Sequence, residues 1–120
     1  MSRLPSVEDF ADLPVDRPMP LIDRQRIIGE KMMVSRVVLH QGFKVDRHAH
    51  ENEQFAVVLS GRIRFDLGEP GTDSARSVEL TGGQVLVIPP NAPHGAEAIE
   101  TTEILDLFSP PSEKTGVDQR

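Results

Sequence analysis

Short apolar segments separated by turn residues are the feature that most constrains the fold of this sequence. In RIRFDL (62–67), Ile63, Phe65 and Leu67 alternate with Arg and Asp, which is the period of a strand with one buried face. Glycine, proline and asparagine separate such segments at 60–61, 82–83 and 89–91. Helical periodicity is hard to find. The pattern predicts an all-β chain, folded as an antiparallel sandwich or barrel.

The 120 residues fit one domain with terminal extensions. Four prolines within residues 1–20 predict an extended N-terminal arm over 1–30, because each lacks a backbone donor and biases its predecessor toward extended structure. The barrel is expected over 31–112. A polar tail, 113–120, follows it.

Composition narrows the classes of partner. The chain has no cysteine, which excludes thiolate chemistry and disulfides, and it starts without the apolar run of a signal peptide. A net charge of −6 argues against nucleic acid, and no segment is apolar for long enough to span a membrane. We therefore expect a cytoplasmic protein whose partner is a small molecule.

Two segments, FAVVL (55–59) and QVLVI (84–88), are apolar at nearly every position instead of every second one. Both faces of these strands should therefore be covered. Because a small barrel covers only the inner face, we expect the proline-rich arm or a second subunit to cover the outer one, and we favour a homodimer.

The segment RHAHENEQ (47–54) carries the candidate chemistry. On an extended strand His48 and His50 would point to the same face, close enough to share one ion. A pair of histidines at this spacing is also common in an ordinary solvated strand end. His40, at another strand end, is interpreted as structural or solvated.

A wider frame surrounds the histidine pair. Five residues separate Gly42 from His48, three separate His50 from Gln54, and six separate Gln54 from Gly61. Further on, five residues separate Gly83 from Pro89, and His94 lies five past that proline. This arrangement resembles the two-motif signature of the cupin superfamily. The resemblance covers residues 31–112 and implies the cupin double-stranded β-helix, an antiparallel jelly-roll barrel.

The sequence departs from that signature at three positions. Gln54 stands where a glutamate is usual, Asn91 replaces a turn glycine, and Ala98 replaces an asparagine. Asparagine tolerates the positive φ of a turn. The amide oxygen of Gln54 can still bind a metal but adds no charge. Glu53 competes for this role, although the spacing to Gly61 and strand alternation favour Gln54.

The carboxyl end, LDLFSPP (105–111), resembles the cupins of pectin degradation that ketonise unsaturated uronates. That resemblance implies one divalent metal ion held by His48, His50, Gln54 and His94, and a functional role for Asp106 and Phe108. The ligand types suit Zn, Ni, Fe or Mn. The arginine that the family places after this run is missing: Ser112 stands there, and Lys114 is a poorer geometric match for a carboxylate.

The leading hypothesis is a metal-dependent enzyme acting on a small sugar-acid or carbonyl substrate by proton transfer, that is, isomerisation, ketonisation or a related cyclase or lyase step. Asp106 would move the proton, provided that its strand face looks into the barrel. Three arginines, Arg36, Arg62 and Arg64, could recognise an anion from inside, but solvated strand faces are the favoured interpretation. The alternatives are a non-haem iron dioxygenase and a non-catalytic module that binds a metal or a small molecule.

Overall fold

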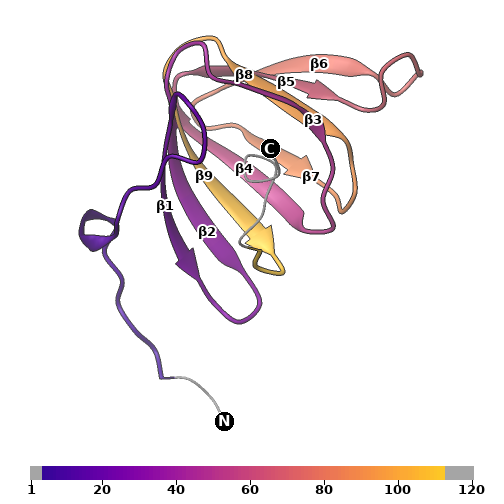
Figure 1. Cartoon of the computed structure of the whole chain (residues 1–120). Coiled ribbons are helices and arrows are strands. Elements are labelled where there is room, and N and C mark those ends of the chain that lie inside the picture. The colour runs from indigo at the N-terminus through magenta and orange to yellow at the C-terminus, as the bar shows by residue number, and fades with distance from the viewer. Residues whose placement is uncertain (1–3, 113–120) are drawn as a thin grey trace.

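A computed structural model describes residues 4–112. Nine strands and one short 3-10 helix make up the fold (Figure 1). The elements are η1 (Phe10–Asp12), β1 (Ile22–Ile28), β2 (Met33–Leu39), β3 (Lys44–His48), β4 (Glu53–Ser60), β5 (Arg62–Leu67), β6 (Arg76–Thr81), β7 (Val85–Ile88), β8 (His94–Ala98) and β9 (Thr102–Ser109). The predicted all-β class is confirmed.

The strands form two antiparallel sheets that face each other. One sheet has the order β1-β2-β9-β4-β7 and the other the order β3-β8-β5-β6. Neighbours in a sheet are often distant in the chain: β2 pairs with β9, and β3 pairs with β8. These crossing connections close the sheets into the expected jelly-roll barrel, with β1 and β7 at opposite edges of the larger sheet.

Strand β1 lies inside the segment 1–30 that the prolines led us to expect as an arm. Pro20 is the last of these prolines, and Ile22–Ile28 pair with Met33–Leu39 along their full length. The barrel therefore begins at Ile22 instead of residue 31. Before it, the chain runs outward past η1, and Asp16 makes one bridge to Arg24 (Figure 1). The predicted polar tail, 113–120, lies outside the described residues.

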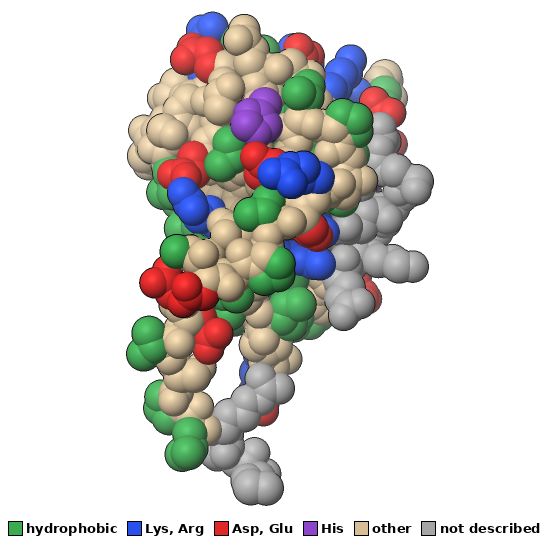
Figure 2. Space-filling view, turned by 60° about the vertical axis from the view of Figure 1, so that its left-hand side comes forward, with side chains coloured by type: hydrophobic (Ala, Val, Ile, Leu, Met, Phe, Trp, Pro, Cys, Tyr) green, Lys and Arg blue, Asp and Glu red, His purple; other side chains and the backbone are tan. Residues whose placement is uncertain are grey.

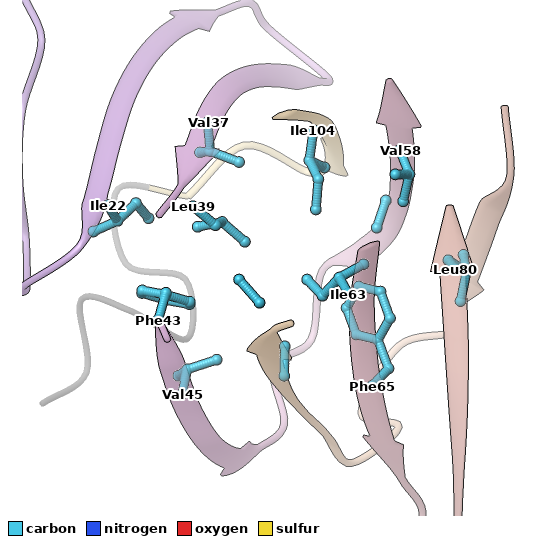
Figure 3. Packing of buried hydrophobic residues seen from close by; sticks show 13 residues of the cluster. Ile22, Val37, Leu39, Phe43, Val45, Val58, Ile63, Phe65, Leu80 and Ile104 are labelled. Atoms are coloured by element: carbon cyan, nitrogen blue, oxygen red, sulfur yellow. The ribbon is translucent and has the colours of Figure 1, made fainter. Parts of the chain in front are cut away.

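The apolar core lies between the two sheets. Figure 3 shows Val37, Ile104 and Val58 from the larger sheet pointing toward Ile63 and Phe65 from the smaller one. Val58 and Ile63 are fully buried, and each lies on a strand whose buried and more exposed residues alternate. Period-two patterning therefore places these residues inside, as the sequence predicted.

Two turns require the residues that occupy them. Gly61, between β4 and β5, has φ of 93°, and an added Cβ would lie 2.3 Å from the carbonyl oxygen of Thr101. Asn91, before β8, has φ of 63°, which is the left-handed conformation expected for it. Its backbone N–H donates to the carbonyl of His50 at 2.8 Å, so this turn touches the candidate site.

The outer surface carries charges of both signs. Figure 2 shows Lys and Arg side chains as well as Asp and Glu side chains on the face near β1. Arg36, Arg62 and Arg64 belong to this outer layer, and each lies within 4 Å of a glutamate on its own sheet or a nearby turn. Within residues 4–112, no helix is long and apolar enough to cross a membrane.

Candidate metal centre

Three histidines converge at one end of the barrel interior. His48 ends β3 and lies directly opposite His94, the first residue of β8. Their ring centroids are 4.3 Å apart, and the ring of His50 lies 5.0 Å from that of His94. One ligand nitrogen from each ring lies within 4.8 Å of the other two. The histidine pair and the distant His94 thus come together as the motif spacing predicts.

His50 reaches this point from a loop and not from a strand. We expected an extended strand to align it with His48, but β3 ends at His48. The loop is held on both sides: Asn91 donates to the backbone of His50, and the buried Asn52 amide donates to the carbonyl of Pro110. These loop contacts therefore take the place of strand alternation.

Each ring is fixed by its own backbone. The Nδ1 atoms of His48, His50 and His94 lie 2.8, 3.0 and 2.8 Å from the carbonyl oxygens of Asp46, Asn52 and Ala92. A carbonyl oxygen only accepts, so each Nδ1 must carry the proton. A neutral ring then has its lone pair on Nε2, and that tautomer is the one that binds metal ions.

His94 provides the strongest single indication that an ion belongs here. Its Nε2 atom is buried and has no hydrogen-bond partner among the described residues. Burial, aided by the charges of His48 and His50, lowers the pKa of His94 to about 4 against the raising effect of the Ala92 carbonyl. The ring is therefore neutral at pH 7, and its buried lone pair lacks the partner that such groups normally have.

Gln54 lies between the histidines and Asp106. Its Nε2 donates to Asp106 Oδ1 at 2.9 Å, which turns its Oε1 toward His50 Nε2 at 3.1 Å. With the proton of His50 on Nδ1, two acceptor atoms face each other. A cation or a proton between them removes this repulsion, and two ligands of one metal ion normally face each other at such a separation.

Asp106 lines the same cavity as His48, Gln54 and His94. It lies on β9 between Ile104 and Phe108, which point inward with it, so the strand face looks into the barrel as the hypothesis requires. Burial raises the pKa of Asp106 to about 6, while the hydrogen bond from Gln54 acts in the opposite direction. The Asp106 side chain is half-buried, as expected for a residue on the wall of the cavity.

Of the other candidate residues, Phe108 lies in the cavity, whereas Glu53 and His40 do not. Phe108 is 5% exposed, lines the cavity and contacts the ring of His50 edge-on at 5.9 Å. Glu53 is exposed on the opposite face of β4. His40 lies away from the cavity, with Nε2 2.9 Å from Asp23 Oδ2. Ser112 is half-buried, and Lys114 lies outside the described residues.

Sequence reasoning missed one charged side chain in the cavity. Arg24, on β1, is 4% exposed and lines the cavity together with Asp106 and two of the histidines. Its segment, IDRQRII, has arginines at two of its inward positions and no regular apolar alternation. No pattern in the sequence therefore set Arg24 apart from the arginines on the outer surface.

These residues fit a divalent ion. Three imidazole nitrogens with fixed lone pairs, one of them an orphaned buried atom, converge beside an amide oxygen. All four donors are neutral, so they would leave the ion its full charge. The donor types suit Zn, Ni, Fe or Mn.

Comparison with known proteins agrees with this geometry. A family model described as "Cupin domain" matches residues 35–108. KdgF from Halomonas sp. has 25% identity and a TM-score of 0.81, covering 92% of this chain and 97% of its own. An RmlC-like cupin from Shewanella frigidimarina has 21% identity and a TM-score of 0.80, covering 94% and 97%.

A larger protein also has this fold. The oxalate decarboxylase of Lactobacillus farciminis has 16% identity and a TM-score of 0.76, with 92% of this chain covered and 36% of that one. Among curated proteins, none matches the chain. The expected resemblance to small single-domain cupins is confirmed, and the chain belongs to the cupin family.

Proposed function

We propose that this protein is a metal-dependent enzyme that transfers a proton on a small sugar-acid or carbonyl substrate, in an isomerisation, a ketonisation or a related cyclase or lyase step. One observation carries the proposal: the carboxylate of Asp106 shares a cavity with the three-histidine cluster and is tied to it through Gln54. The likeness to KdgF supports it.

The ligands in this proposal are His48, His50, His94 and the amide oxygen of Gln54. A divalent ion bound there would polarise a substrate oxygen and make the neighbouring C–H more acidic. The protein's own contribution is a base at the right place. Asp106 accepts the proton and returns it to another carbon, and Gln54 holds the carboxylate by donating to Oδ1.

Phe108 has a shaping role in this proposal. Its ring packs on His50 and forms part of the cavity wall. The ring lies on the same inward face of β9 as Asp106, where burial raises the pKa of that carboxyl. A base whose pKa lies nearer neutrality both accepts and returns protons efficiently.

Deuterium exchange tests the proposal directly. The metal-loaded protein is incubated in D2O with a panel of unsaturated uronates and keto sugars, and NMR follows deuterium entering the substrate carbons. Asp106→Asn should lower the exchange rate by about 10²–10⁴-fold, which is the usual contribution of a positioned base. Elemental analysis should show an unchanged metal content in this variant.

Asp66→Asn is the matched control. Asp66 lies on β5 in a hydrogen-bond network with Ser77 and Arg64 and does not line the cavity. Its substitution by Asn therefore removes one negative charge, as Asp106→Asn does, but outside the site. This variant should exchange at the wild-type rate. Wild-type activity retained in Asp106→Asn would remove the proton-transfer role.

We also propose that the chain forms a homodimer through the outer face of β4 and β7. Phe55 and Val87 lie opposite each other there and are 38% and 54% exposed; Leu59 and Val85 are 43% and 47% exposed. The described part of the arm bridges to β1, at the other edge of the sheet, and leaves this face open. A second copy remains the occupant that we expected.

Light scattering coupled to size-exclusion chromatography tests this interface. The wild-type protein should elute with the mass of two chains at micromolar concentration, and Val87→Glu should elute as one. A wild-type monomer would contradict the proposal.

A further inference from the structure

Arg24 is a buried cation that the proposed chemistry does not use. It is 4% exposed and is the one Lys or Arg side chain among the described residues that line the cavity. By contrast, the side chains of Arg36, Arg62 and Arg64 are 30–44% exposed and pair with carboxylates on the outer surface. Burying a guanidinium is costly, so its position inside the barrel requires an explanation.

Asp16 is one partner of Arg24. It accepts two bonds from Arg24, from Nε at 3.0 Å and from Nη2 at 2.7 Å, and lies 3.6 Å from Nη2 of Arg26. Two guanidinium groups thus surround one carboxylate.

The Nε–Nη2 edge of the Arg24 guanidinium pairs with Asp16, so a substrate carboxylate would have to meet its Nη1–Nη2 edge. A guanidinium has five donors in one plane, and the two bonds to Asp16 fix the orientation of that plane. Ser35, on the neighbouring strand, adds a hydroxyl to the same cavity wall and is 3% exposed. The wall therefore presents a cation and a hydroxyl, the usual donors for a carboxylate group.

The register places Ser35 next to the proposed base and Arg24 two strands away on the same sheet. Ser35 on β2 lies directly opposite Asp106 on β9, and Arg24 on β1 lies opposite Val37 on β2. The backbones of β1 and β9 are two strand spacings apart, about 10 Å, and the long Arg24 side chain shortens that span. A molecule of sugar size can therefore contact Arg24 at one end and Asp106 at the other.

We propose that Arg24, with Ser35 beside it, is the subsite that binds the carboxylate group of the substrate. The inference rests on the proposed function and narrows it: the substrate is a sugar acid whose charged end lies at β1 and whose reacting carbon lies at Asp106. A purely structural role, in which Arg24 only anchors the arm through Asp16, is the competing explanation.

Calorimetric titration of the metal-loaded protein tests the subsite without requiring turnover. The probes are D-galacturonate and its methyl ester, which have the same ring oxygens and differ by one charge. The wild-type protein should bind galacturonate at least ten times more tightly than the ester. Arg24→Gln should lower affinity for galacturonate by about 10–100-fold, the usual value of a hydrogen bond to a charged group, and leave affinity for the ester unchanged.

Three further variants make the result decisive. Arg36→Gln removes a positive charge from the outer side of the same sheet and should leave both affinities unchanged. Asp16→Asn removes the anchoring charge but keeps one acceptor for Arg24, so the preference for galacturonate should weaken and persist. A purely anchoring role predicts instead that Arg24→Gln and Asp16→Asn both lower the melting temperature while the galacturonate-to-ester ratio stays at the wild-type value. Arg24→Lys keeps the charge without the fork and should retain a weaker preference; it carries the test if Arg24→Gln does not fold.

The outcomes separate the subsite from the reaction. An unchanged galacturonate-to-ester ratio in both Arg24 variants would overturn the subsite, even if Asp106→Asn abolishes proton exchange. An Arg24-dependent preference in a protein that exchanges no proton would support the subsite and contradict the proposed reaction. Wild-type protein that binds neither probe would overturn the subsite as well.

Discussion

The two halves of the barrel interior are built by the same strands but differ in kind. The inward positions run from His94 to Ala98 in β8, from Gln54 to Val58 within β4, and from Asp106 back to Ile104 within β9. In each strand the inward positions change from polar to apolar within a few residues. In one half the side chains fill space; in the other they present hydrogen-bonding and ligand atoms.

The difference lies in how each half is maintained. The apolar half depends on many interchangeable contacts among side chains such as Val58, Ile63 and Ile104. The polar half depends on single contacts: one carbonyl for each histidine ring and one amide for Asp106. We infer that substitutions in the first half lower stability, and that substitutions in the second lower binding or turnover while the chain stays folded.

The largest effect is expected for His94→Ala. Loss of a ligand should weaken metal binding by more than the roughly 10–100-fold that loss of an outer hydrogen-bond partner costs. The metal-free variant should melt near the wild-type temperature, because the substitution also removes an unpartnered buried nitrogen. Elemental analysis and calorimetric melting measure the two quantities. His40→Ala, on the surface, should keep its metal.

Ile104→Ala should lower the stability of the protein and leave its metal binding unchanged. Ile104 is 2% exposed in the apolar half, and such truncations cost about 2–5 kcal/mol of unfolding free energy. Urea denaturation measures the loss, and the folded fraction should still bind metal at the wild-type ratio. Loss of metal from folded Ile104→Ala protein would show that the two halves are not independent.

Gln54→Leu tests the fourth ligand. Metal affinity should fall about 10–100-fold, less than for His94→Ala, since three imidazoles remain. Glu53→Leu, one residue away on the exposed face, should leave the affinity unchanged. The reverse result would assign the ligand to Glu53.

The smallest effect concerns Asp16 and pH. The hydrogen bond from Arg24, aided by the charges of Arg24 and Arg26, lowers the pKa of Asp16 below its usual value near 3.8, against the effect of desolvation. A lowered folded-state pKa gives stability that is present above about pH 4 and lost as pH falls through the folded-state value. The melting temperatures of wild type and Asp16→Asn should therefore converge in acid. A difference between the two melting temperatures that stays constant with pH would contradict the stabilising role of the Asp16 charge.

Much of the fold and part of the site were readable from the sequence. Alternation in residues 62–67 predicted β5. The motif spacing predicted that His94 would lie beside His48, 46 positions earlier in the chain. The loop that positions His50 could not be predicted, because it depends on a long-range bond between Asn52 and Pro110. Arg24 was missed for a similar reason: its inward position follows from pairing with β2 and Asp16, and not from a local pattern.

The amide of Gln54 makes one half of the centre sensitive to the other. An amide has a donor end and an acceptor end: here Nε2 donates to Asp106, and Oε1 faces the lone pair of His50 Nε2 across the position proposed for the ion. The group cannot rotate toward one neighbour without loosening its hold on the second. If the proposed ion is exchanged for a larger or smaller one, the carboxylate of Asp106, the proposed base, should shift with Gln54. The identity of the metal would then adjust reactivity through the position of Asp106 as well as through the charge of the ion.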